Sequence, residues 1–141
     1  MREITPPTLD TIQKIYDLGI DPLGAARLSD EALDFEYGYG LSTNPESFGY
    51  KANANSSMFA LAYIIENLDH LNDLEAFSSA VHDGWSYTVY HFEDSAYETN
   101  PSKKESRLAL ANQTYAELSN QEQEKDRVIA RVVLQMIKDR L

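Results

Sequence analysis

The residues best suited to chemistry are a run of aromatic side chains followed closely by cations. The aromatic members are Trp85, Tyr87, Tyr90, Phe92 and Tyr97, and the cations just downstream are Lys103, Lys104 and Arg107. Flat aromatic faces stack on nucleobases, and Lys and Arg pair with phosphates or carboxylates. The combination is typical of a nucleotide-binding site. The alternative is that the rings belong to the core and the cations are solvated.

A second group of chemically capable residues overlaps the first. His82 and Asp83 precede Trp85, and His91, Glu93 and Asp94 follow it. His and carboxylate side chains bind metals or act as acid–base pairs. The spacing matches no closed metal motif, and the chain has no cysteine. We therefore expect no metal site, no cofactor and no catalytic residue here, with His82 interpreted as a hydrogen-bonded core side chain.

Helical patterns lie on both sides of residues 82–107, which hold these candidate groups, and the first pattern begins near the N-terminus. Thr8 or Asp10 can cap a helix that ends at Gly19, and Asp21-Pro22 opens a second pattern, either one bent helix or two. Gly38-Tyr39-Gly40 lacks the spacing of a phosphate loop and is interpreted as a helix terminator. We predict an ordered loop over residues 40–56.

The C-terminal two thirds contain the strongest helix signals. Ser56 or Ser57 can cap a core helix over residues 58–68, and a second helix is expected over residues 73–85. Residues 86–101 are compatible with a strand or with a continued helix. Leu108, Ala111, Tyr115 and Leu118 fit one helical stripe, and Ser119 with Glu122 forms an S-x-x-E capping box before the last helix.

Together these patterns predict an all-α fold, a single compact helical domain of five to seven helices. Its core is expected around residues 58–68 and 128–137. A minor pair of strands near residues 86–92 remains the alternative for that segment.

Composition narrows the functional classes. The formal net charge of −11 argues against non-specific nucleic-acid binding, because that affinity comes from Lys and Arg displacing counterions. Residues 28–102 hold thirteen acids and one base, whereas residues 103–141 hold eight bases and six acids, so a phosphate group should prefer the C-terminal third. No apolar run approaches the roughly 20 residues of a membrane-spanning helix. With no cysteine and no visible secretory signal, we expect a cytoplasmic protein without nucleic-acid or membrane partners.

Three short blocks suggest a family resemblance. They are His82-Asp83-Gly84-Trp85, Tyr115-Ala116-Glu117-Leu118-Ser119, and Asp126-Arg127-Val128-Ile129-Ala130. In order and spacing they resemble the RyR domain, the helical module repeated in ryanodine receptors and found in bacterial and phage proteins. Gly84 and Ser119 differ from the family's usual pattern. The resemblance covers about residues 58–141 and divides the chain into an N-terminal part, 1–57, and an RyR-like part, 58–141.

The resemblance implies a ligand-binding module rather than an enzyme. RyR repeats are non-catalytic, one pair holds an adenine nucleotide between tryptophans, and prokaryotic and phage members are suspected of sensing or sequestering nucleotide-derived signals. The resemblance implies that Trp85 occupies the position of a tryptophan that stacks on the nucleotide. His82 would orient the helix end, and Tyr115, Asp126 and Arg127 would build the fold.

From these observations we expect a non-catalytic binder of a nucleotide-like small molecule, in a phage or bacterial signalling or defence context. The expected ligand-binding residues are Trp85, Tyr87, Tyr97, Lys103, Lys104, Arg107, Arg127 and His82. One alternative is a protein-interaction module assembling through the apolar stripe of residues 128–141. Another is a nucleotide-processing enzyme using His82, Asp83 or His91. Homo-oligomerisation is expected in each case.

Overall fold

Six α-helices, with three short 3₁₀ helices between them, make up the described chain. The computed structural model describes residues 1–97 and 100–141, and none of these residues forms a strand. The elements are α1 (Leu9–Asp17), α2 (Pro22–Tyr37), α3 (Phe48–Ile65), η1 (Leu68–His70), α4 (Leu74–His91), η2 (Asp94–Tyr97), α5 (Pro101–Ala111), η3 (Tyr115–Glu117) and α6 (Asn120–Lys138). The predicted all-helical fold of five to seven helices is confirmed. The segment 86–101, which the sequence left open, includes residues 98–99, and these two lie outside the described residues.

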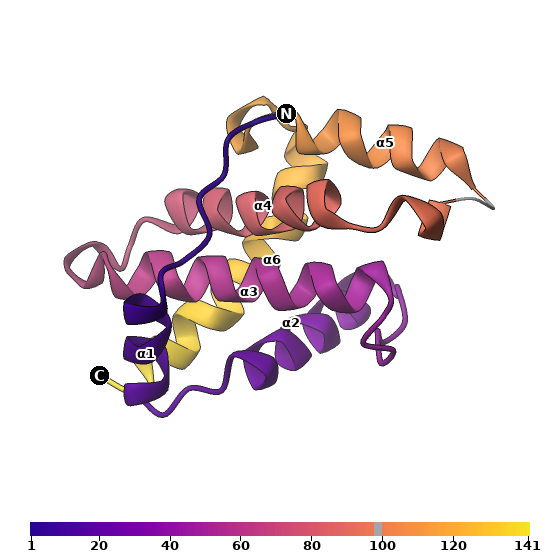
Figure 1. Ribbon diagram of the computed structural model, residues 1–141. Helices are drawn as coiled ribbons and strands as arrows, with labels where there is room; N and C mark the ends of the chain where they lie inside the picture. The colour runs from indigo at the N-terminus through magenta and orange to yellow at the C-terminus, as the bar shows by residue number, and fades with distance from the viewer. Residues whose placement is uncertain (98–99) are drawn as a thin grey trace.

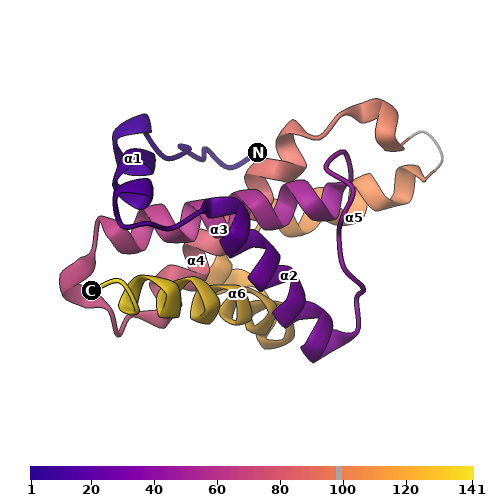
Figure 2. The same ribbon diagram turned by 90° about the horizontal axis from the view of Figure 1, so that it is seen from below.

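An antiparallel pair, α3 and α4, forms the centre of the molecule (Figure 1). Helix α5 packs along the outer side of α4, and α6 contacts α2, α3 and α4. Figure 2 shows α2 and α6 on the same side of α3, with the loop of residues 38–47 returning from α2 to the start of α3. Residues distant in sequence therefore meet where α2, α3, α4 and α6 come together.

The N-terminal helix signals act as predicted. The side chain of Thr8 caps α1 by accepting a hydrogen bond from the backbone N–H of Thr11. Asp21 caps α2 in the same manner, and α2 is one helix rather than two. It ends at Gly38, whose φ of 68° is the left-handed conformation that glycine adopts readily.

Helix α3 begins earlier than predicted, at Phe48 rather than after Ser56, so the expected loop over residues 40–56 is wrong in its second half. Ser47 is the cap and accepts a hydrogen bond from the N–H of Tyr50. The polar residues of the first turns are compatible with a packed helix because neighbouring helices satisfy them. Asn53 donates to Asp30 of α2, and Asn55 donates to Thr88 of α4.

Helix α4 continues to His91, which corrects the alternative of a minor strand pair near residues 86–92. Asp73 caps α4 by accepting a hydrogen bond from the backbone N–H of Ala76, so the predicted start near residue 73 is confirmed. Thr88 and Val89 have intrinsic strand preference, but both are buried. Tertiary packing outweighs a local preference that is worth a fraction of a kcal/mol per residue, on the order of 0.5 kcal/mol.

In the C-terminal third, the predicted single helical stripe over residues 108–118 is wrong. Leu108, Ala111, Tyr115 and Leu118 do not share a helix, because α5 ends at Ala111 and Tyr115 lies in η3. The last helix begins as predicted, since Ser119 accepts a hydrogen bond from the N–H of Glu122. The Glu122 carboxylate pairs with Lys125 at 3.2 Å.

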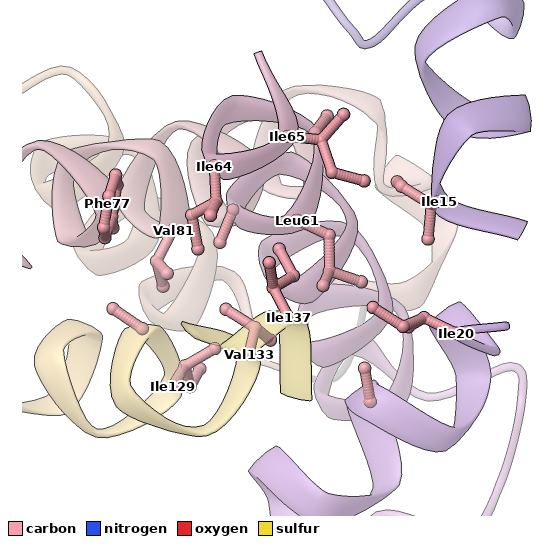
Figure 3. Packing of buried hydrophobic residues seen from close by; sticks show 14 residues of the cluster. Ile15, Ile20, Leu61, Ile64, Ile65, Phe77, Val81, Ile129, Val133 and Ile137 are labelled. Carbon is pink, nitrogen blue, oxygen red and sulfur yellow. The ribbon is translucent and has the colours of Figure 1, made fainter. Parts of the chain in front are cut away.

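The hydrophobic core joins all of the long central helices (Figure 3). Its fully buried large side chains are Ile15, Ile20, Leu61, Ile64, Phe77, Val81, Val133 and Ile137. Both predicted core segments are confirmed, and α1 and α2 contribute to the same cluster, so residues 1–57 and 58–141 share one core. None of the helices in the described ranges is long and apolar enough to cross a membrane.

The chain's first residues run across α4 and α3 before α1 begins (Figure 1). Arg2 anchors this segment with three hydrogen bonds of 2.8–2.9 Å, to Asp83, to Ser86 and to the carbonyl of Ala111. The N-terminal segment is therefore tied to α4 and to the end of α5.

Gly84 allows α3 and α4 to approach closely. A Cβ atom at this position would lie 2.5 Å from the backbone oxygen of Asn55 and 2.7 Å from the Cα of Ser56. Both atoms belong to the backbone of α3 and have no rotamer by which to move away. A glycine in mid-helix costs roughly 1 kcal/mol relative to alanine, and here the close approach of the two helices explains it.

We predict that Gly84→Ala destabilises the protein by about 2 kcal/mol or more, because it forces two helix backbones apart. Gly24→Ala in α2 is the matched control. Its Cβ would meet Asp21 at 3.5 Å, an ordinary contact, so the gain in helix propensity should stabilise the protein by roughly 0.5–1 kcal/mol. Chemical denaturation of both variants measures the difference. Equal effects of the two substitutions would contradict the close approach.

Candidate functional site

A cavity of about 400 Å³ lies where α2, α3, α4 and α6 meet. This volume falls within the range of small-molecule sites. The side chains that line it include Asp30, Tyr39, Phe48, His82, Trp85, Leu110, Glu122, Lys125 and Asp126. Segments separated by almost a hundred residues contribute to one site.

Aromatic rings form one wall of the cavity. The Trp85 ring is half-buried, and it packs edge to face with the Phe48 ring at a centroid distance of 5.9 Å and an interplanar angle of 90°. The guanidinium carbon of Arg107 lies 3.7 Å from the centroid of the Phe48 ring. A cation over a ring face is attracted by the ring's quadrupole, so Arg107 holds Phe48 in place.

His82 lies beside Trp85 and is 3% exposed. Its Nε2 is 2.7 Å from the backbone oxygen of Gln113. Because a carbonyl only accepts, Nε2 carries the hydrogen, and Nδ1 of the neutral ring is left with a lone pair. Burial lowers the pKa of His82, which favours this neutral form.

Asp126 faces His82 from α6. Its Oδ2 lies 3.9 Å from Nδ1 of His82, beyond hydrogen-bond distance. The Asp126 side chain is 14% exposed, and Oδ2 is buried without a hydrogen-bond partner among the residues that the structure describes. Burial raises the pKa of Asp126 well above its usual value, and the nearby Glu122 carboxylate adds to this shift. The cavity wall thus presents a carboxyl group whose burial disfavours ionisation, beside an imidazole whose burial favours the neutral form.

The remaining polar groups make the cavity acidic. Asp30 accepts hydrogen bonds from the Asn53 side chain at 2.9 Å and from the backbone N–H of Ser42 at 2.7 Å. Glu122 and Lys125 form an ion pair. Apart from Asp126, whose burial disfavours ionisation, two carboxylates and one lysine share the lining, an arrangement that disfavours an anionic ligand.

Two of the eight predicted ligand-binding residues, Trp85 and His82, line this cavity. Tyr87 instead stacks on His91 at 4.1 Å. Tyr97 is buried, accepts a hydrogen bond from Arg107 and packs against Phe92. Neither tyrosine lines the cavity beside Trp85.

The four predicted phosphate-binding cations do not line the cavity. Lys103 is exposed on α5, and Lys104 pairs with Asp94. Arg107 packs on Phe48 behind the aromatic wall. Arg127 forms two hydrogen bonds to Glu75, of 2.9 and 3.0 Å, and also pairs with Glu124. These contacts give Arg107 and Arg127 structural partners.

The alternative acid–base group of His82, Asp83 and His91 does not converge on the cavity. Asp83 pairs with Arg2 at 2.9 Å, and His91 bonds the backbone oxygen of Tyr87 in its own helix. Within residues 1–97 and 100–141, no cluster of three or more His, Asp or Glu side chains is arranged to hold a metal ion.

The polar and aromatic residues of the lining that sequence reasoning missed include Asp30, Tyr39, Phe48, Glu122 and Lys125. Asp126 was assigned to the fold alone. The only local signal for the missed side of the cavity was Gly38-Tyr39-Gly40, where Tyr39 and Gly40 reach the lining. The other contributions depend on how the helices pack.

Comparison with protein-family models, with curated proteins and with solved structures finds no match to this chain. The resemblance to RyR domains therefore stays a prediction from the sequence.

The raised pKa of Asp126 predicts a pH-dependent cost to stability. A carboxyl group whose pKa is raised on folding contributes most below its unfolded pKa, and that contribution is lost as pH rises towards the folded value. Asp126→Asn does not titrate. The variant should therefore gain stability relative to wild type as pH rises above about 4, by up to about 1.4 kcal/mol per pH unit, until Asp126 ionises in the folded protein.

Denaturation midpoints of wild type and variant across this pH range measure the effect. Asp139→Asn, which removes an exposed carboxyl group at the end of the same helix, controls for the change in net charge. A difference between wild type and Asp126→Asn that stays constant with pH would show that Asp126 ionises freely in the folded protein.

Proposed function

We propose that the protein is a non-catalytic binder of a nucleobase-type small molecule, which it senses or sequesters. The observation that carries this proposal is the half-buried Trp85 ring in the wall of a cavity of about 400 Å³. A base stacked on an aromatic side chain gains about 1–3 kcal/mol. The resemblance to RyR domains supports the same class of ligand.

The proposed ligand has a base that stacks in the cavity, but it makes none of the phosphate contacts that the sequence predicted. The cavity lining contains three carboxyl groups, and its lysine is already paired with one of them. Phosphates held in this lining would meet little compensating charge. A nucleobase or nucleoside therefore fits the site better than a nucleotide whose phosphates are enclosed.

The alternative of an assembly module receives less support. Assembly through the stripe of residues 128–141 needs the apolar side chains of the last helix to be exposed. The apolar residues of α6 are instead largely buried, with Val128, Ile129, Val133 and Ile137 all below 9% exposure. Homo-oligomerisation, a cytoplasmic location and a bacterial or phage context stay predictions from the sequence.

Binding is tested by titrating the protein with adenine, cytosine, adenosine and cytidine. Trp85 is the chain's only tryptophan, so its fluorescence reports directly on a ligand in the cavity. Variants without Trp85 have no tryptophan fluorescence, so calorimetry measures their affinities. Trp85→Ala should weaken binding about tenfold or more, as expected for one stacking contact.

Phe35→Ala is the matched control, because Phe35 is an aromatic residue of α2 that is 89% exposed and lies outside the cavity lining. It should bind like wild type. Ligand recovered unchanged after incubation would separate a binder from the enzyme alternative. If none of the four compounds binds wild type, the proposed function is wrong.

A further inference from the structure

The polar side of the cavity points to the charge of its ligand. We infer that the cavity selects a planar nitrogen cation, of the amidinium or protonated amino-heterocycle class, whose N–H groups are accepted by the Asp126 carboxylate and by Nδ1 of His82. This inference rests on the proposed function, in which a flat ring occupies the cavity against Trp85. Beyond that function, the ring must carry a positive charge, and its N–H groups must lie on the edge that faces Asp126 and His82.

Two buried atoms beside Trp85 can accept hydrogen bonds from a ligand. Oδ2 of Asp126 is buried without a partner among the described residues, and Nδ1 of His82, 3.9 Å away, has a lone pair because Nε2 donates to Gln113. A single amino group has enough hydrogens to donate to both atoms. A ligand that offers only acceptors, such as a carboxylate, would leave Nδ1 of His82 without a donor, and it could bond Asp126 only through the proton of that carboxyl group.

Charge favours the same ligand class. Asp30, Glu122 and Asp126 outnumber Lys125 in the lining, and Lys125 is paired with Glu122. A cation over the face of an indole gains a further 0.5–2 kcal/mol, roughly, depending on how far it is desolvated. The aromatic wall and the acidic wall therefore both stabilise positive charge.

Binding of such a cation should release a proton. Without ligand, burial raises the pKa of Asp126 above its usual value, which favours the protonated carboxyl group. A cation beside it favours the carboxylate, and the displaced proton passes to the buffer. The charged and titratable groups around the pair are Glu122, Lys125 and Arg127 on α6, Asp83 on α4, Asp30 on α2 and Arg2 of the N-terminal segment.

The sign of the pH dependence follows from this coupling. As pH falls, protonation of Asp126 and then of His82 opposes a cation, so its affinity should fall. As pH rises, the cost of deprotonating Asp126 disappears, and affinity should increase until the carboxyl group is ionised in the absence of ligand. A ligand bound by stacking alone would show neither trend.

The test uses benzamidine, benzamide and benzoate, three planar probes of similar size that are cationic, neutral and anionic. Calorimetry at about pH 6 and about pH 8 gives their affinities, and repeating it in buffers of different ionisation enthalpy gives the protons released. We expect benzamidine to bind at least about tenfold more tightly than benzoate, since a charge-assisted hydrogen bond is worth about 1.5–3 kcal/mol. Its affinity should rise with pH, with net proton release.

Asp126→Asn should abolish proton release and weaken benzamidine binding about tenfold, as loss of one charge-assisted hydrogen bond requires. Asp139→Asn, the exposed control on α6, should retain both. The wild-type proton release and the probe ranking need no variant, so the inference stays testable if Asp126→Asn folds poorly. Benzoate binding as tightly as benzamidine, or benzamidine affinity independent of pH, would overturn it.

Failure of the inference and failure of the proposed function give different results. Nucleobase binding that depends on Trp85, together with equal affinity for benzamidine and benzamide, would reject the cation preference and keep the function. Benzamidine binding with proton release, but no nucleobase or nucleoside binding, would reject the nucleobase proposal and keep the cation site. Benzamidine affinity unchanged in Trp85→Ala would place the probe outside the cavity and overturn the inference.

Discussion

The contact of α3 with α4 at Gly84 is the constraint on which the rest of the structure depends. The α3 backbone approaches so closely that a single added carbon would lie 2.5 Å from the Asn55 carbonyl. This approach sets Phe48, at the start of α3, against the Trp85 ring of α4. It also positions α2 and α6, which both pack on α3, around the remaining sides of the cavity. A wider spacing between the two helices would separate the walls of the site.

Burial of the Asp126 carboxyl group at the site lowers the stability of the fold, and packing of the hydrophobic core must offset this loss. Asp126 is an acidic side chain that is largely buried from solvent, its Oδ2 has no partner among the described residues, and its pKa is raised by that burial. Buried polar groups without partners destabilise a fold. The opposite arrangement occurs nearby, where Arg127 and Tyr115 both bond Glu75 and lower the pKa of Glu75 to about 2. Adjacent residues of α6 thus have contrasting roles: Arg127 stabilises the packing of α6 on α4, and Asp126 leaves an unsatisfied acceptor at the cavity.

The charge distribution along the chain illustrates the limit of composition as a guide to a ligand. The C-terminal third is the only part where bases outnumber acids, yet the cations there are largely engaged by acids and rings of the fold itself. Arg107 is packed on Phe48 and Arg127 is bonded to Glu75. The part of α6 that reaches the cavity presents two carboxyl groups and a lysine. The sign of the potential at a site therefore depends on which side chains point into it, and not on the local excess of one charge.

The sequence alone determined the helical class and the starts of α1, α2, α4 and α6. Those features depend on local interactions: caps such as Thr8, Asp21 and Ser119, terminators such as Gly38, and apolar stripes with helical spacing. Tertiary structure alone decided that the Ser- and Asn-rich start of α3 is helical and that α4 continues through Val89, because partners on other helices satisfy or bury those residues. It also decided the membership of the cavity, since Asp30, Phe48, Trp85 and Asp126 meet only through the packing of four helices. No local pattern encodes the crossing of helices or the burial of one carboxyl group, because both depend on the summed contacts of the whole core.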